Sequence, residues 1–435
     1  MGHKTYPEYR DSGVQWLGEV PSHWETRRLK YAAPLRNIKV VAGESDLPYI
    51  GLENIESWSG KYIVQDEAND SEGVSSRFYP GDVLFGKLRP YLAKAFLANF
   101  EGACSSELLV LQGKGVQPEF LVRFVLSVGF IREVDSSTYG AKMPRASWEF
   151  IGNLPVTLPP TEEQSTITAF LDEKTSQIDQ LIEKKTRFIE LLKEKRAALI
   201  TEAVTGKFDV RTGKPYPEYK DSGVEWLGEV PVHWETKKLK YIGKAIIGLT
   251  YDPKEISDDG IVVLRATNIQ NGFLSLNDVV RVKKQIPTEL ITKSGDIFIC
   301  SRNGSRQLIG KNVLIGRPAE GYSFGAFTTV FRSPMNDFVY HVFNSDLFSY
   351  QSGLFMTSTV NQLTTSMLNN MEIPLPPACE QEKIVAFLHD NKRQIDQLIE
   401  KTQQSIDLLK EKRAALITAA VTGKIDVRDW NTEAA

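Results

Sequence analysis

The sequence predicts an α+β protein in which two α/β domains are joined by two long helices that pack as an antiparallel coiled coil. Three observations lead to this fold class. A segment near the start of the chain occurs twice, a long amphipathic segment also occurs twice, and the stretches between these copies differ. The chain has 435 residues, 41% of them hydrophobic and 25% charged. This length suffices for two or three folded units, and this composition excludes a mostly disordered chain.

The first repeat pairs Tyr6–Tyr31 with Tyr216–Tyr241, which share 21 of 26 residues and exchange Arg for Lys at three of the others. Their mixture of aromatic residues, Gly and Pro predicts ordered loop rather than helix. We expect the tryptophans to anchor each domain on its helix. Because Trp is enriched at interface hot spots, they are also candidates for partner binding. These residues are Trp16, Trp24, Trp226 and Trp234.

The second repeat is helical. Apolar residues recur at helical spacing in Glu162–Val204 and again from about Glu380 to Val421, with charged residues on the opposite face. A helix of some 40 residues would be about 60 Å long, more than a compact domain needs, so we expect the two helices to pack on each other. The predicted stripe contains Leu171, Ile178, Leu181, Ile182, Phe188, Leu192 and Leu199 in the first copy, and Ile395, Leu398, Ile399, Ile406, Leu409 and Leu416 in the second.

Polar residues interrupt this stripe. Lys185 and Thr402 are expected at equivalent seam positions, as are Phe188 and Ser405, and polar seam residues can fix register and partner choice. Antiparallel pairing of the helices would relate the two halves of the chain by a pseudo-twofold axis.

Between the repeats lie two dissimilar segments, at about 32–158 and 242–375. Neutral drift after a duplication would spread sequence differences evenly along the chain. Here the repeated segments, which form a constant frame, are nearly identical, whereas the variable segments between them differ. A frame held constant by one shared partner, presenting two units with different targets, explains this contrast better. The chain therefore divides into a first domain 1–158, a central helical region 159–206, a second domain 207–375 and a C-terminal helical region 376–435.

No catalytic motif accompanies this frame. The sequence has no phosphate-binding loop ending in Gly-Lys-Ser/Thr, no Gly-x-Ser-x-Gly and no His-Glu-x-x-His. The pair Glu162 and Glu163 begins a helix, where capping or solvated roles are commoner than catalysis. The cysteines Cys104, Cys300 and Cys379 lack ligand spacing, so neither a zinc site nor a disulfide is expected and a reducing, cytoplasmic compartment is favoured. No apolar run approaches the length that spans a bilayer.

Basic and polar tracts without acidic residues occur in both variable segments, at 85–94 and 139–147 and at 301–312 and 358–365. Arg, Lys, Asn and Gln read base edges in the major groove, while Ser, Thr and Lys suit phosphate contacts. A single tract of this kind is more often a solvated loop than a functional site, but two in each segment make them candidates for DNA contact. The net charge of −3 leaves room for such local patches. The candidate residues are Lys87, Arg89, Tyr91, Lys94, Tyr139, Lys142, Arg145, Arg302, Asn303, Arg306, Lys311, Asn361 and Gln362.

The duplicated WLGEVPxHWExxxLKY segments, the PPxxEQ helix starts and the LLKEKRAALIT…AVTGK helix ends together resemble the specificity subunit (HsdS) of type I restriction–modification systems. The resemblance covers essentially the whole chain. It implies that each variable unit is a target recognition domain reading one half of a bipartite site in double-stranded DNA, with the helices setting the gap.

The resemblance also implies that two modification (methyltransferase) subunits dock on the frame and that restriction subunits join them. S-adenosylmethionine, ATP and Mg²⁺ would bind those partners and not this chain, which would itself hold no metal and no catalytic residue. The alternative is a coiled-coil scaffold whose variable units bind proteins or glycans. A salt titration distinguishes the DNA-binding subunit from the scaffold, because binding to DNA weakens steeply as the ionic strength rises.

Overall fold

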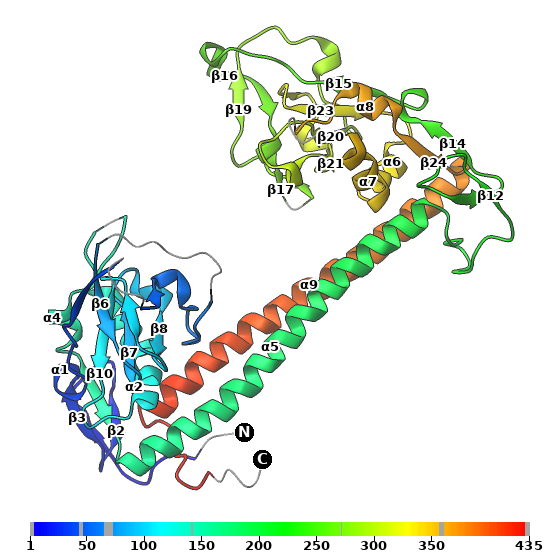
Figure 1. Cartoon of the computed structure of the whole chain (residues 1–435). Coiled ribbons are helices and arrows are strands. Elements are labelled where there is room, and N and C mark those ends of the chain that lie inside the picture. Colours follow the sequence, from blue (N-terminus) through cyan, green and yellow to red (C-terminus); the bar gives the residue numbers. More distant parts are fainter. Residues whose placement is uncertain are drawn as a thin grey trace. The chain divides into compact units, whose positions relative to one another are not determined.

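The computed structural model describes residues 4–42, 47–64, 73–140, 142–270, 272–355 and 361–430 (Figure 1). The chain divides into two compact units. Unit 1 combines residues 1–186 with 403–435, and unit 2 is formed by residues 187–402. The two long helices, α5 (Thr161–Val204) and α9 (Ala378–Val421), therefore each contribute one part to each unit. The compact units thus do not follow the linear division into two domains and two helical regions.

Both long helices have 44 residues, without Pro or Gly. They end at equivalent glycines: Gly206 has φ +71° and Gly423 has φ +74°. The amides of the following residues, Lys207 and Lys424, donate to carbonyls five residues back, at 2.9 and 2.8 Å, as in a Schellman cap. A Cβ at Gly423 would lie 2.3 Å from Pro21, so glycine is required there for space as well as for backbone conformation.

The two helices run antiparallel in each unit, as predicted. In unit 1, Arg413 of α9 donates through Nε to Asp179 of α5 at 2.9 Å. In unit 2, Arg196 of α5 pairs with Asp396 of α9. These four residues occupy equivalent positions of the repeat, so the internal repeat extends to the contacts between the helices.

The seam between the helices differs from the predicted stripe. Leu181 and Phe188 are 47% and 45% exposed, whereas Ile189 is buried. Buried and half-buried positions alternate at spacings of four and three, the pattern of a coiled-coil seam. They are Leu171, Thr175, Ile178, Ile182, Lys185, Ile189, Leu192 and Arg196.

The predicted seam positions Phe188, Leu181 and Leu398 are therefore wrong, whereas Ser405 is half-buried beside the buried Ile406. Phe188 lies one residue, or about 100°, away from the seam position Ile189. The same is true of Leu398, which is 46% exposed. Lys185 and Thr402 do lie on the seam.

Unit 1 carries its strands in the sheet orders β1–β2, β3–β11, β4–β6–β9–β5 and β10–β7–β8. The strands are β1 (Tyr9–Asp11), β2 (Glu19–Pro21), β3 (Glu25–Arg28), β4 (Lys39–Ala42), β5 (Tyr49–Ile50), β6 (Gly73–Phe78), β7 (Asp82–Gly86), β8 (Ala95–Leu97), β9 (Gly102–Cys104), β10 (Leu108–Gln112) and β11 (Pro155–Leu158). The shorter helices are α1 (Leu29–Ala32), α2 (Pro118–Val125), α3 (Val128–Ser136), α4 (Trp148–Ile151), η1 (Leu52–Asn54) and η2 (Pro90–Leu92), the last two being 3₁₀ helices.

Unit 2 has the sheet orders β12–β13, β14–β24, β15–β23–β20–β21, β19–β16–β22 and β17–β18. Its strands are β12 (Tyr219–Asp221), β13 (Glu229–Pro231), β14 (Glu235–Lys238), β15 (Lys244–Ile247), β16 (Ile256–Leu264), β17 (Ile269–Gln270), β18 (Phe273–Leu274), β19 (Val280–Val282), β20 (Ile297–Cys300), β21 (Asn312–Leu314), β22 (Ser323–Phe324), β23 (Thr328–Arg332) and β24 (Glu372–Leu375). Its helices are α6 (Asn336–Phe343), α7 (Asp346–Phe355), α8 (Thr365–Asn370), η3 (Leu239–Tyr241), η4 (Pro253–Glu255), η5 (Ala266–Asn268), η6 (Thr288–Leu290), η7 (Arg306–Leu308) and η8 (Arg317–Ala319).

The first repeat forms a frame of strands rather than the predicted loop. In each copy a short hairpin is followed by a strand that pairs antiparallel with the strand leading into a long helix, β3 with β11 and β14 with β24. The variable segment is thereby inserted between two paired strands. This pairing fixes where each variable segment begins and ends relative to its helix.

The core of each unit includes the long helices. In unit 1, Ile417, Ala420 and Val421 of α9 are buried in the cluster that contains Trp24. In unit 2, Ala203 of α5 is buried in the cluster that contains Trp234. Each variable domain therefore completes its core with the end of a helix, which gives it a rigid attachment.

Candidate nucleic-acid interface

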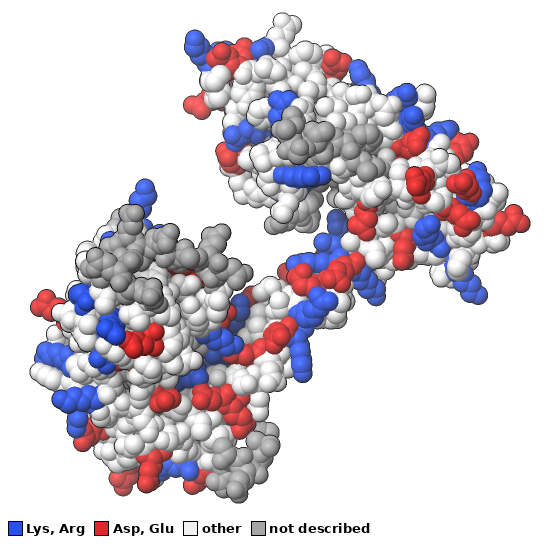
Figure 2. All heavy atoms as spheres, in the orientation of Figure 1, with Lys and Arg blue, Asp and Glu red and all other residues white. Residues whose placement is uncertain are grey.

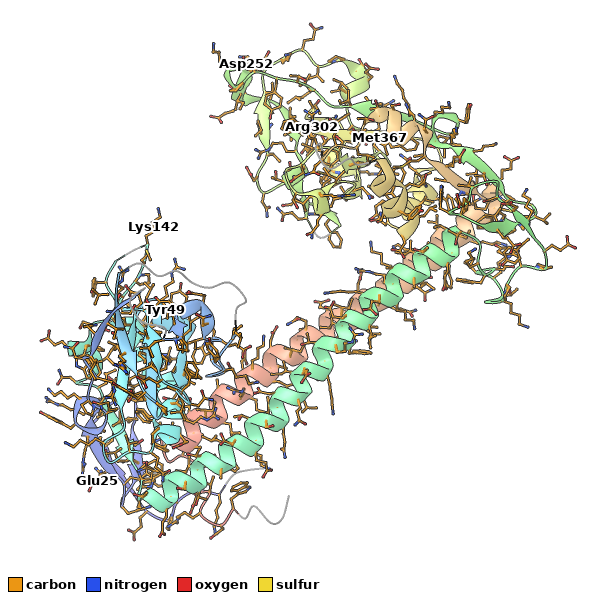
Figure 3. The ribbon with its side chains drawn as sticks, viewed as in Figure 1. Glu25, Tyr49, Lys142, Asp252, Arg302 and Met367 are labelled. Carbon is orange, nitrogen blue, oxygen red and sulfur yellow. The ribbon has the colours of Figure 1, made fainter. Side chains whose placement is uncertain are left out.

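The structure brings together the two basic tracts predicted in unit 1, although about 50 residues separate them in the sequence. The Arg89 amide donates to the Pro144 carbonyl at 2.8 Å, and the Ala146 amide donates to the Lys87 carbonyl at 3.0 Å. Figure 3 shows Lys142 at the outer edge of unit 1, at the end opposite to Glu25. The tracts therefore form one surface feature, held by backbone hydrogen bonds.

A strained turn supports this surface. Arg89 and Ala93 flank η2 with φ values of +50° and +47°, a region that side-chain-bearing residues rarely occupy. The Ala93 carbonyl accepts a hydrogen bond from the amide of Trp58, at 2.9 Å, and Trp58 itself has φ +64°. Between the strained residues, Tyr91 is 48% exposed. Such strain persists where surrounding contacts impose it, and it gathers at functional sites.

Two of the predicted unit 1 residues are held inside the unit. The Lys94 amine donates to the Leu52 carbonyl at 2.6 Å, and burial lowers the pKa of Lys94. Arg145 donates to the carboxylate of Glu107 at 3.0 Å. Lys94 and Arg145 therefore position the loops. Among the residues that the structure describes, no acidic partner is found for Lys87, Arg89 and Lys142.

Tyr139 is the remaining predicted residue of unit 1. It is 64% exposed, and its backbone exchanges two hydrogen bonds with Arg145, both of 3.1 Å. An exposed aromatic ring anchored by its own backbone suits stacking or phosphate contact.

The predicted tracts of unit 2 also meet. The Leu363 amide donates to the Ser301 carbonyl at 2.8 Å, and Arg302 donates through Nη2 to Oε1 of Gln362 at 2.6 Å. Residues 358–360 of the second tract lie outside the described residues. The loop that follows β20 is therefore joined to the segment that precedes α8.

The other predicted side chains of unit 2 bond to nearby backbone or lie half-buried. Asn303 accepts from the Ser305 amide at 3.0 Å, and Asn361 donates to the Gly304 carbonyl at 3.1 Å. Arg306 reaches the Gly353 carbonyl only at 3.5 Å. Lys311 is half-buried at the end of its tract.

Sequence reasoning missed Phe327, which precedes β23. Its ring is 61% exposed, and the Arg302 guanidinium lies over it, 5.6 Å from the ring centroid. The Phe327 carbonyl accepts from the Arg302 amide at 3.0 Å. No charge or repeat marks this residue in the sequence, so its role becomes visible only when the two loops are placed together.

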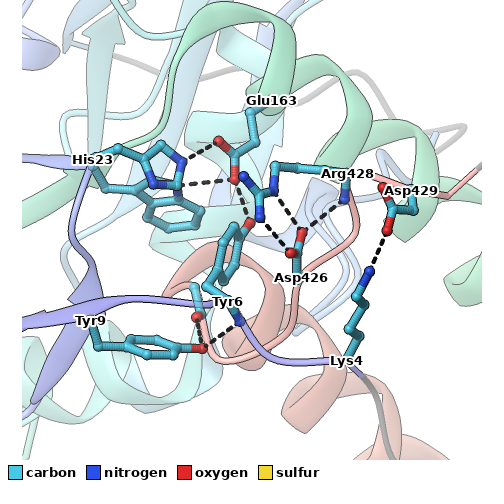
Figure 4. Close-up of polar contacts among 10 residues, drawn as sticks. Lys4, Tyr6, Tyr9, His23, Glu163, Asp426, Arg428 and Asp429 are labelled. Carbon is cyan, nitrogen blue, oxygen red and sulfur yellow. Dashed lines mark hydrogen bonds and ion pairs between the residues drawn. The ribbon is translucent and has the colours of Figure 1, made fainter.

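The repeated frame carries a buried carboxylate in each unit. In unit 1, Glu163 accepts from Trp24 Nε1 at 3.0 Å and from the Tyr6 hydroxyl, and its other oxygen lies 2.9 Å from His23 Nε2 (Figure 4). The expected capping or solvated role of Glu163 is therefore wrong, because its side chain is only 6% exposed. Burial, together with the hydrogen bond to Glu163, raises the pKa of Tyr6.

Unit 2 repeats this arrangement around Glu380. Trp234 Nε1 donates to it at 2.9 Å, the Tyr216 hydroxyl donates at 3.2 Å, and His233 Nε2 lies 2.9 Å away. Burial alone would raise the pKa of Glu380, but the hydrogen bonds from Trp234 and His233 outweigh it and hold this pKa below its ordinary value.

The partner-binding interpretation is wrong for Trp24 and Trp234, which are 1% and 0% exposed and bond to these carboxylates. Both are core anchors, the alternative that the sequence favoured. Trp16 and Trp226 are half-buried and pack against rings of their own units, Trp16 against Phe124 at a centroid distance of 6.2 Å.

Charges of both signs are interspersed on the face drawn in Figure 2. Within the described ranges, no group of three or more His, Cys, Asp or Glu side chains is arranged to hold a metal ion. No helix among the described residues has the length and apolar character that a membrane crossing requires.

Comparison with known proteins gives consistent matches. A family model described as the type I restriction modification DNA specificity domain matches residues 21–191 and 231–408. The chain is 26% identical over 442 residues to the type I restriction enzyme MjaVIII specificity subunit of Methanocaldococcus jannaschii, a match that covers 95% of each protein. It is 31% identical over 215 residues to the EcoKI specificity subunit of Escherichia coli K12, covering 47% of this chain and 46% of that relative, or about half of each.

Two solved structures share the fold. One chain comes from a structure on complex assembly and conformational transition of the type I R-M system, with a TM-score of 0.70, 19% identity and coverage of 92% of this chain and 98% of that chain. The other is the HsdS subunit from Thermoanaerobacter tengcongensis, with a TM-score of 0.50, 18% identity and coverage of 93% and 98%.

Proposed function

The chain belongs to the type I restriction–modification DNA specificity family, and from this premise we propose that each of its units reads one half of a bipartite DNA site. The observation that carries the proposal is the convergence of two polar tracts in each unit. The tracts differ between units 1 and 2, whereas the frame that holds them is repeated. Two unlike readers on a common frame suit a site with two unlike halves.

The chemistry of the surfaces supports DNA as the ligand. Unit 1 presents Lys87, Arg89 and Lys142 together with two exposed tyrosines, and unit 2 presents Arg302 over an exposed ring. Cationic side chains neutralise phosphates, while Arg and amide groups read base edges. The net charge of −3 makes this attraction a local property of the loops.

The helix pair would act as the spacer between the half-sites. Each helix has 44 residues, about 66 Å at 1.5 Å per residue, and the partly buried Arg–Asp pairs hold its seam in register. Half-sites read on one face of DNA lie about 34 Å or a multiple of it apart. Joining two weak readers by a stiff spacer raises their combined affinity when the spacing matches.

The catalytic steps would belong to other subunits. Two modification subunits would dock on the repeated frame, one for each copy, and restriction subunits would join that assembly. S-adenosylmethionine, ATP and Mg²⁺ would bind those subunits, and this chain would act as their non-catalytic guide to the DNA. The close similarity of the frame in both halves supports this view, since two copies of one partner require two equivalent surfaces.

A segment exchange tests the proposal. Residues 32–154 are replaced by the equivalent segment 242–371, so that both units carry the second reader, and the complex is assembled with the modification subunits. Methylation mapping should then give a site in which both halves read the second sequence. The unaltered complex serves as the control, and its binding should weaken steeply between 50 and 200 mM salt, as expected for several phosphate contacts (about 10³–10⁵-fold for six to ten). An unaltered target after the exchange, or binding that is insensitive to salt, would refute the proposal.

A further inference from the structure

Two segments of unit 2 that are distant from Arg302 in the sequence meet at this residue. Its Nη2 donates to Gln362 Oε1 at 2.6 Å, and its guanidinium lies 5.6 Å from the centroid of the Phe327 ring. Its backbone amide donates to the Phe327 carbonyl at 3.0 Å. The side chain is therefore held at two points, and its backbone at a third, although the residue is exposed.

The partners of Arg302 distinguish it from other arginines of the same unit. Arg332 pairs with Asp296 at 2.6 Å, and Arg265 pairs with Asp278 at 2.9 Å. Among the described residues, no carboxylate pairs with Arg302; its partners are a neutral amide and an aromatic ring. Its orientation is thus restrained while its charge is not neutralised, so less conformational entropy is lost when it binds a ligand.

We propose that Arg302 reads a guanine in the half-site recognised by unit 2, and that Gln362 and Phe327 position it. This inference rests on the proposed DNA-reading function. A guanidinium has five N–H donors, of which one is used by Gln362, and two of the others suffice for the O6 and N7 acceptors of guanine in the major groove. Phe327 and Gln362 are positioning residues, acting through the direction of the Arg302 side chain.

The stacking on Phe327 favours base reading over phosphate contact. A phosphate requires only positive charge, which Lys supplies as well as Arg, whereas a planar fork aimed by a ring and an amide suits a planar acceptor pair. Arg306 provides the contrast: within the described part of the chain its side chain reaches one partner, the Gly353 carbonyl at 3.5 Å, and so lacks such restraint. Replacing Arg302 by Lys therefore separates the two roles.

The experiment uses the complex assembled with its modification subunits and a DNA library in which the first half-site is fixed and the second is randomised. Arg302→Ala and Arg302→Lys should each reduce the preference for guanine at one position of the second half-site by about 10- to 100-fold. The first half-site should be unchanged. Phe327→Ala and Gln362→Ala should each reduce the same preference by a smaller factor, about 3- to 10-fold, and leave the salt slope of binding unchanged.

Arg281→Lys is the matched control, because Arg281 is also an exposed arginine of unit 2. Among the residues that the structure describes, its side chain donates to one backbone carbonyl, that of Gly260 at 3.1 Å. It should change no base preference. Thermal unfolding of each variant checks that unit 2 remains folded.

Retention of the guanine preference in both Arg302→Ala and Arg302→Lys would overturn the inference, because the preference would then not depend on the donors of the arginine side chain. The inference would also be overturned if the Arg302 variants bound every library sequence equally less well and their salt slope fell by about one. That result would identify Arg302 as a phosphate contact. Failure of the proposed function looks different: the unaltered complex would then select no bipartite site at all.

Discussion

Arg413 on α9 donates through Nε to Asp179 on α5 at 2.9 Å, and this arginine is 7% exposed. Its Nη1 also donates to the Trp58 carbonyl at 2.9 Å. Because the Trp58 amide in turn donates to Ala93, one arginine connects the helix pair of unit 1 to the strained turn of its candidate reader. The equivalent Arg196 of unit 2 makes its pair with Asp396, at sites that are 35% and 38% exposed.

This difference predicts unequal effects of the same substitution at the two equivalent positions. Arg413→Ala leaves the Trp58 carbonyl without its donor and Asp179 with Lys61, at 3.2 Å, as its remaining partner, so unit 1 should lose about 2–3 kcal/mol of unfolding free energy. Arg196→Ala, its control, removes a pair that is more than a third exposed and should cost less than about 1 kcal/mol. Denaturant unfolding followed by hydrogen exchange in each unit measures both. Equal losses would show that burial of the pair does not determine its contribution.

A second prediction concerns acid stability of unit 2. Burial, with help from the nearby cations Lys392 and His389, lowers the pKa of His341 to about 4. Since the unfolded chain titrates near 6.5, it binds more protons than the folded chain between these values, and stability falls as pH decreases from 6.5 to 4. The loss should approach about 3 kcal/mol and should be absent in His341→Gln. Unfolding of unit 2 measured at pH 7.5, 5.5 and 4.5 tests this, and an equally steep decline in the variant would assign the effect to another group.

A third prediction separates loop positioning from DNA contact in unit 1. Lys94→Met removes the donor to the Leu52 carbonyl, so stability should fall by about 1–3 kcal/mol while the salt slope of DNA binding stays constant. Arg89→Gly keeps the left-handed backbone that Arg89 adopts at φ +50°, so stability should hold. The salt slope of DNA binding by Arg89→Gly should fall by about one, because one cationic contact with the DNA is lost. If Lys94→Met instead lowered the salt slope and Arg89→Gly instead lowered the stability, Lys94 would be the DNA contact and Arg89 the residue that positions the loop.

The sequence predicts the local features of this fold but not the contacts between distant loops. The long helices follow from the positions of Pro and Gly and from apolar spacing, which are local signals, and the basic tracts are visible in the composition. The sequence did not predict that the two tracts of each unit meet, because contacts between distant loops have no local signal. Neighbouring apolar residues such as Phe188 and Ile189 left the helical phase ambiguous by one position, and only packing resolves it. Lys94 turns inward toward a carbonyl 42 residues away, and Phe327 gains its partner from another loop. Neither contact has a local signature.

The last prediction addresses the helix pair as a spacer. Inserting seven residues after Glu194 of α5 and seven after Gln397 of α9 adds one heptad to both helices at facing positions, as the Arg196–Asp396 pair defines them. The seam keeps its phase, because the insertion equals one heptad repeat. Each helix lengthens by about 10 Å, so the gap between half-sites should grow by about three base pairs at 3.4 Å each, with neither half-site altered.

Methylation mapping of the assembled complex measures this gap. Insertion into α5 alone is the control: it shifts one side of the seam past the other, so it should destabilise the helix pair and abolish selection of either gap. A double insertion that folds but still selects the original gap would show that the helices do not set the spacing. The distance between the half-sites would then have to be fixed by something other than the length of these helices.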